Sequence, residues 1–240
     1  MISPIAELRS FGRAALIDPL EHERQESTEA LVQRRWISSV GLAVGSFMLA
    51  FTLRLAPGDP AFYAATFALS VVWIVAGLVA GSIHLGRSRR RRGNGFGRGI
   101  LQGVILGIAL LSIFLAGSAL VAPIPALRDP LVAMLLHGDK GLAPLVAVLT
   151  GLIAIGEELF FRGALWAAVG GRQALLVTTL VYALTTIPSG FPLMVLAAAV
   201  VGFVAGAHRR VTGGVLGPII IHLIWSLGLF LLLPVILGGS

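Results

Sequence analysis

Residues 144–169 have the sequence PLVAVLTGLIAIGEELFFRGALWAAV. The run is long and apolar enough to cross a bilayer, which takes about 20 residues of helix. Near its middle lie two adjacent carboxylates, Glu157 and Glu158, and Arg162 follows one turn later. Ionisable side chains at bilayer depth are costly and usually mark function. The segment therefore predicts a membrane-spanning helix that carries a functional site.

The composition of the whole chain agrees with a membrane protein. The 240 residues are 57% hydrophobic and 12% charged, whereas a soluble domain carries about 25% charged residues. The first 35 residues are polar, so no cleavable signal sequence is expected. There are no cysteines, which excludes disulfides, thiol nucleophiles and cysteine metal ligands. We expect an all-α, polytopic bundle of transmembrane helices.

The apolar runs predict about seven spans and a simple domain organisation. The predicted spans are 37–56, 62–84, 99–122, 144–169, 173–188, 191–207 and 214–236. Residues 1–36 should form a polar cytoplasmic tail with an interfacial helix at Ser27–Trp36. Three spans follow in 37–122, and 123–143 should be an outer loop with a short helix at Leu131–His137. The last four spans, within 144–236, form the predicted core.

The arginines predict the orientation of these spans. With the N-terminus inside, 14 of the 18 basic residues fall on inner segments, while the outer loops hold Arg128 and Lys140. This asymmetry follows the positive-inside rule and places the C-terminus outside. The run Arg87–Arg92 lies directly at a span end, so topology explains the net charge of +7 and no nucleic-acid partner is expected.

Small-residue pairs occur in four of the predicted spans. Such spacing allows helices to approach closely, and we expect it to serve internal packing rather than a dimer face. The pairs are Gly41/Gly45, Gly77/Gly81, Gly103/Gly107 and Gly202/Gly206.

The two carboxylates have different local surroundings. Glu158 and Arg162 are four residues apart in the order that favours an ion pair on a helix, which explains how Arg162 tolerates this depth. Glu157 points about 100° away and has no local partner. It could therefore serve as a general base or a proton carrier. The alternative is a charge cluster that only ties helices together.

His222 is the best candidate for a partner of these carboxylates. It lies about eight residues into the last span, roughly 12 Å from the inner end, and Glu158 lies roughly 16 Å from the inner end of its own span. The two residues are therefore expected to share one site. Ser226 follows His222 by one turn, and Tyr182 and Thr186 form a similar pair in the fifth span. The alternative for each of these groups is a satisfied residue of the core.

The local sequence Glu157-Glu158-Leu-Phe-Phe-Arg162-Gly163 resembles the first motif of the CPBP family. This is the CAAX-protease and bacteriocin-processing group of intramembrane glutamic endopeptidases, also called Abi, and the resemblance covers residues 144–236. It implies that Glu157 is the general base that activates water, and that Glu158 and Arg162 hold the helix geometry. His222 and Ser226 would stabilise the oxyanion of the tetrahedral intermediate.

Two later motifs depart from the family pattern. The second motif, Phe-x-x-x-His, corresponds to Tyr182-x-x-x-Thr186, and the third, His-x-x-x-Asn, to His222-x-x-x-Ser226. Ser226 can still donate one hydrogen bond, but Thr186 cannot act as a base or hold water as an imidazole does. The resemblance thus implies either a metal-independent peptidase with a degraded second motif, or a non-catalytic relative that acts as a membrane scaffold or regulatory partner.

The remaining expectations concern partners and cofactors. We expect a multi-pass protein of a bacterial inner membrane, in contact with lipids and with a peptide or membrane-protein substrate. Spans four, five and seven should wall a cavity open toward the cytoplasm. No metal or other cofactor is expected, because His-Glu-x-x-His is absent and two Glu with one distant His are a poor zinc set. A proton-coupled transporter is a weaker hypothesis, since no inverted repeat of interrupted helices is evident.

Overall fold

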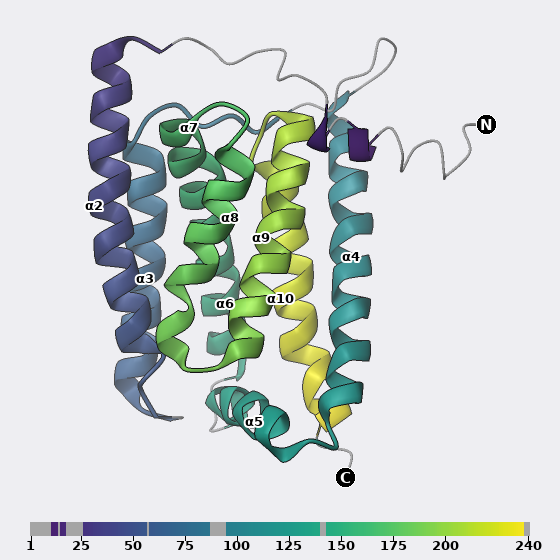
Figure 1. The fold of residues 1–240 in the computed structure, drawn as a ribbon. Coiled ribbons are helices and arrows are strands. Elements are labelled where there is room, and N and C mark those ends of the chain that lie inside the picture. Colours follow the sequence, from purple (N-terminus) through teal and green to yellow (C-terminus); the bar gives the residue numbers. More distant parts are fainter. Residues whose placement is uncertain are drawn as a thin grey trace, which may run out of the picture.

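The fold is known from a computed structural model, which describes residues 11–13, 15–17, 26–56, 58–86, 95–139 and 143–237. The tail residue His22, the run Arg87–Arg92 and Lys140 lie outside the described residues. Every regular element named below is helical, and most of the long helices stand side by side (Figure 1). The prediction of an all-α helical bundle is confirmed.

The helices follow one another in a simple order. They are α2 (Thr28–Thr52), α3 (Pro60–Val79), α4 (Gly95–Val121), α5 (Pro125–Asp139), α6 (Ala143–Glu158), the π-helix η1 (Leu159–Leu165), α7 (Trp166–Val169), α8 (Ala174–Thr185), the short 3₁₀ turn η2 (Ile187–Ser189), α9 (Pro192–Thr212) and α10 (Leu216–Leu237).

Within the described residues, six helical segments are long and apolar enough to cross a membrane. A shorter apolar helix, Ala174–Ser189, stands among them and corresponds to the fifth predicted span. The chain is therefore a multi-pass membrane protein. In Figure 1, α2 begins at the end of the bundle opposite to the end where α10 finishes, as an odd number of crossings requires. Which end faces the cytoplasm stays a prediction from the distribution of arginines.

The structure differs from expectation at two helix boundaries. Ser27 caps α2, because its Oγ accepts a hydrogen bond from the backbone N–H of Ala30 at 3.2 Å. Residues 28–36 are consequently the first turns of the spanning helix, not a separate interfacial one. The helix α5 is longer than the predicted Leu131–His137 and crosses one end of the bundle (Figure 1). It begins at Pro125, where a missing N–H costs nothing.

The paired glycines lie at internal contacts between helices. A Cβ atom on Gly41 would lie 2.8 Å from the Cβ of Ala76, and one on Gly77 would lie 2.9 Å from the backbone of Leu159. Such distances leave no room for a side chain. The predicted role of these glycines in internal packing is confirmed, and Gly77 lets α3 approach the start of the π-helix.

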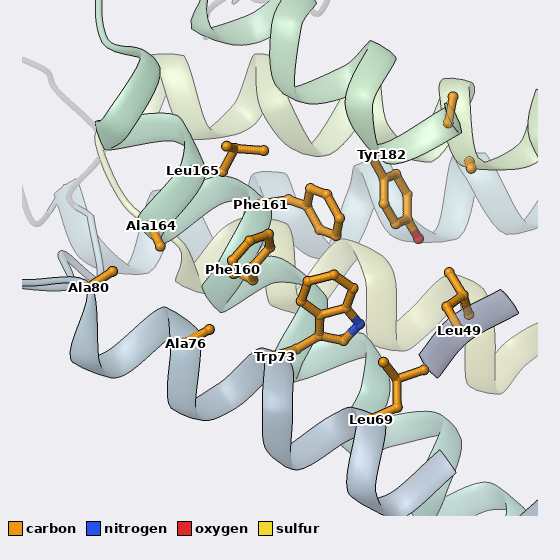
Figure 2. Packing of buried hydrophobic residues seen from close by; sticks show 12 residues of the cluster. Leu49, Leu69, Trp73, Ala76, Ala80, Phe160, Phe161, Ala164, Leu165 and Tyr182 are labelled. Carbon is orange, nitrogen blue, oxygen red and sulfur yellow. The ribbon is translucent and has the colours of Figure 1, made fainter. Parts of the chain in front are cut away.

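An aromatic cluster holds the π-helix in the core (Figure 2). The ring of Trp73 lies 4.5 Å from that of Phe160 and 5.2 Å from that of Phe161, centroid to centroid. The ring of Phe161 lies 4.9 Å from that of Tyr182 on α8. All four side chains are buried, and aromatic pairs at such distances add to the burial of their surface. The cluster therefore joins α3, η1 and α8 beside the two carboxylates.

Candidate active site

The two carboxylates lie at the junction between two kinds of helix. Regular α6 ends at Glu158, and the seven residues Leu159–Leu165 form a π-helix. π-helical turns are rare and are often found at functional sites. The carbonyl of Arg162, inside this turn, accepts a hydrogen bond from Nε–H of Arg209 on α9 at 2.9 Å. A side chain from another helix thus provides a partner for a carbonyl within the wider turn.

Glu158 is fully buried and ion-paired. Its Oε1 lies 3.1 Å from Nη1 of Arg162 and 2.8 Å from Nδ1 of His222. The Cζ of Arg162 also lies 4.9 Å from the centroid of the Tyr182 ring, in a cation–π contact. The predicted Glu158–Arg162 pair is therefore present, and it also contacts His222 and Tyr182.

The buried ion pair is not completely satisfied. Among the described residues, Oε2 of Glu158 and the Nε and Nη2 atoms of Arg162 have no hydrogen-bond partner. An unpaired buried polar atom typically costs about 1–3 kcal/mol. These unpaired atoms therefore reduce the net stabilisation that the ion pair provides.

Glu157 has different surroundings from its neighbour. Its Oε2 accepts a hydrogen bond from the hydroxyl of Tyr182 at 2.6 Å, and Nε2 of His222 lies 3.8 Å from the same oxygen. The Glu157 side chain is 9% exposed, whereas that of Glu158 is 0% exposed. Glu157 is therefore the less completely buried of the two carboxylates. The sequence analysis did not predict this hydrogen bond, because it considered partners of Glu157 on the same helix and Tyr182 lies on α8.

His222 connects the two carboxylates. Its ring extends from α10 so that Nδ1 faces Glu158 and Nε2 faces Glu157. The structure thus brings the Glu pair and His222 together, as the similar depth of Glu158 and His222 led us to expect. A hydrogen bond from Nδ1–H to Glu158 fixes the orientation of the ring. Because the two nitrogens face different carboxylates, the three groups do not converge on one point, and no metal-binding group of three such residues occurs in the described ranges.

Two candidate hydroxyls are engaged within their own helices. The Ser226 hydroxyl donates to the backbone carbonyl of His222, and the Thr186 hydroxyl donates to that of Ala183 at 2.7 Å. Such local bonds are usual for Ser and Thr in membrane helices. Among the described residues, then, Tyr182 and not Thr186 is the side chain of α8 that bonds to Glu157.

The site is walled as expected but is nearly closed. α6, α8 and α10 supply Glu157, Tyr182 and His222, in agreement with the predicted walls from spans four, five and seven. Only 5% of the His222 side chain and 9% of the Glu157 side chain are exposed. The expected cavity that opens toward the cytoplasm stays a prediction.

Two buried carboxylates, an arginine and a histidine on facing helices define a membrane-embedded carboxylate–histidine site. The family model described as "Type II CAAX prenyl endopeptidase Rce1-like" matches residues 139–228. The match contains all the site residues named above, so this part of the chain is similar to that family, in agreement with the resemblance of its motifs to the CPBP group. The family indicates a membrane protease of the CAAX type, a hydrolase. Comparison with curated proteins and with solved structures gives no match.

Proposed function

We propose that the protein is a metal-independent intramembrane endopeptidase in which Glu157 activates a water molecule. The observation that carries this proposal is the contrast between the two carboxylates. Glu158 is fully buried and contacts Arg162 and His222, while Glu157 is bound through one oxygen to Tyr182 and retains exposed surface. A general base must reach the water that it deprotonates, and this requirement favours Glu157, the less completely buried carboxylate.

The proposed reaction is direct hydrolysis of a peptide bond. The water oxygen bonds to the carbonyl carbon of the substrate while Glu157 takes a proton from that water. The tetrahedral intermediate then collapses, the carbon–nitrogen bond breaks, and the proton on Glu157 moves to the departing amine nitrogen. Glu157 is thereby returned to its starting state, and no metal or covalent enzyme intermediate takes part.

His222 is the proposed stabiliser of the oxyanion. In its doubly protonated form both ring nitrogens donate, so that Nδ1–H remains bound to Glu158 while Nε2–H is available to developing negative charge. Glu158 and Arg162 would act on the reaction by holding this ring in place.

Ser226 is expected to contribute little to the rate. Its hydroxyl already donates to the His222 carbonyl, so it would have to leave this bond in order to reach an oxyanion. We expect Ser226→Ala to lower kcat by less than about threefold, well below the effect of removing an engaged oxyanion donor, about 10²–10³. Steady-state kinetics of the purified variant measure this. A hundredfold loss would place Ser226 among the groups that touch the oxyanion.

The substrate class follows from the family and from the location of the site. The family model is that of a prenyl endopeptidase, so we propose as substrate a membrane-associated peptide or protein, in the first instance one with a prenylated C-terminal CAAX sequence. The lipids around the bundle would be those of a bacterial inner membrane. A nucleic-acid partner forms no part of this proposal.

Hydrolysis by the purified protein in lipid nanodiscs tests the proposal. We expect mass spectrometry to detect release of the C-terminal tripeptide from a prenylated CAAX peptide, at an unchanged rate after treatment with EDTA or 1,10-phenanthroline. The same peptide without its prenyl group should be cleaved more slowly, because it does not partition into the bilayer. Absence of cleavage by folded protein, or a loss that added zinc reverses, would contradict the proposal.

The second candidate function is that of a non-catalytic scaffold or regulatory partner in the membrane. The observation in its favour is that Thr186, where the family has histidine, bonds within its own helix and adds no group to the site. Such a protein would bind a peptide in the same place as a scaffold or regulator. Peptidase activity that arises only in Thr186→His would support this candidate, and Glu157-dependent turnover by the unmodified protein would exclude it.

A further inference from the structure

Tyr182 is the residue of this site to which neither composition nor motif assigns a task. Its hydroxyl donates to Oε2 of Glu157 at 2.6 Å, a short bond of the kind expected with a charged acceptor. We infer that Tyr182 is a positioning residue for the reaction: its hydroxyl holds Glu157 in the orientation that activates water. The inference rests on the proposed function, because Tyr182 acts through Glu157.

The ring of Tyr182 is fixed from several sides. Its centroid lies 4.9 Å from that of Phe161 and 6.3 Å from that of His222, and the Arg162 guanidinium lies over its face. The side chain is buried at 6% exposure. A phenol held in this way loses little further freedom when it bonds to a carboxylate, so it can set the direction of that carboxylate.

The hydrogen bond also gives the two carboxylate oxygens of Glu157 different roles. Tyr182 occupies Oε2, which leaves Oε1 to accept a proton from water. A rotating carboxylate would present either oxygen in many directions, whereas a fixed one presents Oε1 to the reacting water in one orientation. The neighbouring hydroxyls do not duplicate this role, since Thr185 and Thr186 donate to backbone carbonyls of α8.

A hydroxyl at position 182 can therefore supply a contact to the general base that position 186 does not. Thr186 lies at the C-terminal cap of α8, with its hydroxyl bound to Ala183. Tyr182 lies one turn earlier and reaches Glu157 because of the length of its side chain. The substitution of histidine by threonine need not abolish activity if the base is held from this second position.

The variant Tyr182→Phe tests the inference in the full-length protein. It removes the hydroxyl and keeps the ring that Phe161 and Arg162 contact. We expect kcat for the prenylated peptide to fall about tenfold to a hundredfold, with KM changed less than about twofold, because a hydrogen bond to a charged group is lost without loss of substrate contacts. The matched control is Tyr63→Phe on α3, the other tyrosine of the chain, which should retain full kcat. A kcat for Tyr182→Phe within twofold of the unmodified protein, or an effect on KM alone, overturns the inference.

A second measurement does not depend on activity. In the Tyr63→Phe background, Tyr182 is the sole tyrosine, so the ring bands in ultraviolet resonance Raman spectra report its hydrogen bond alone. We expect Glu157→Ala to shift these bands and Glu29→Ala to leave them unchanged. Unshifted bands overturn the inference even if the protein is an active peptidase. Conversely, a shift together with normal turnover by Glu157→Gln would confirm the bond and reject the proposed function.

Discussion

Replacement of Arg162 by methionine is expected to lower the free energy of unfolding by about 3–5 kcal/mol. The change removes one partner of a fully buried ion pair and leaves Glu158 charged, or forces it to take up a proton, in surroundings without water. It also removes the cation that lies over the Tyr182 ring. Methionine has an unbranched side chain that fills much of the same space, so the decrease in the free energy of unfolding comes more from the lost charge than from lost volume. Equilibrium unfolding of the purified protein in mixed micelles measures it.

Two further variants show whether the ion pair is the cause. The double variant Glu158→Gln/Arg162→Met removes both charges and should be more stable than Arg162→Met alone, which gives a coupling energy by a double-mutant cycle. Arg54→Met is the matched control, because Arg54 is an exposed arginine near the end of α2, and its effect should stay within about 0.5 kcal/mol. If Arg54→Met and Arg162→Met lowered the free energy of unfolding equally, the buried ion pair would have no special role in stability.

The helices were predictable because the bilayer imposes a simple rule. A chain in hydrocarbon must satisfy its own backbone hydrogen bonds, so apolar runs of sufficient length become helices. The run 144–169 agrees closely with the observed segment Ala143–Val169. The Glu158–Arg162 pair was predictable for a similar reason, since a four-residue spacing fixes which side chains meet on one helix.

Contacts between helices were harder to predict because they depend on rotation about each axis. The sequence predicted a similar depth for Glu158 and His222, but the assignment of Nδ1 to Glu158 and Nε2 to Glu157 needed coordinates. The Tyr182–Glu157 bond depends on how α8 faces α6. A signal was nevertheless present, because a phenol stands where the related motif has a phenylalanine without a hydroxyl.

The π-helix was not predictable from the pattern of apolar residues. An α-helix and a short π-helical segment bury the same kinds of side chain, and Leu159–Leu165 is continuous with the apolar run before it. What maintains the wider turn is tertiary: the Arg209 side chain binds the Arg162 carbonyl, and Trp73 packs against Phe160 and Phe161. Such contacts come from elements distant in the sequence.

The variant Glu157→Gln is expected to lose about 10²–10⁴ of the peptidase rate, the usual contribution of a general base. An amide of the same shape cannot take a proton from water. Its oxygen can still accept the hydrogen bond from Tyr182, and the Glu158–Arg162 pair is untouched, so the fold should be preserved. The matched control is Glu29→Gln, the same chemical change at an exposed position in the first turn of α2, which should leave the rate unchanged.

The role of Glu157 as the general base is tested by the kcat of Glu157→Gln relative to the unmodified protein, measured on a prenylated CAAX peptide in the presence of a chelator. We expect a loss of at least about a hundredfold in a variant whose unfolding midpoint matches that of the parent. Turnover by Glu157→Gln at the rate of the unmodified protein would contradict it and would remove Glu157 from the chemistry.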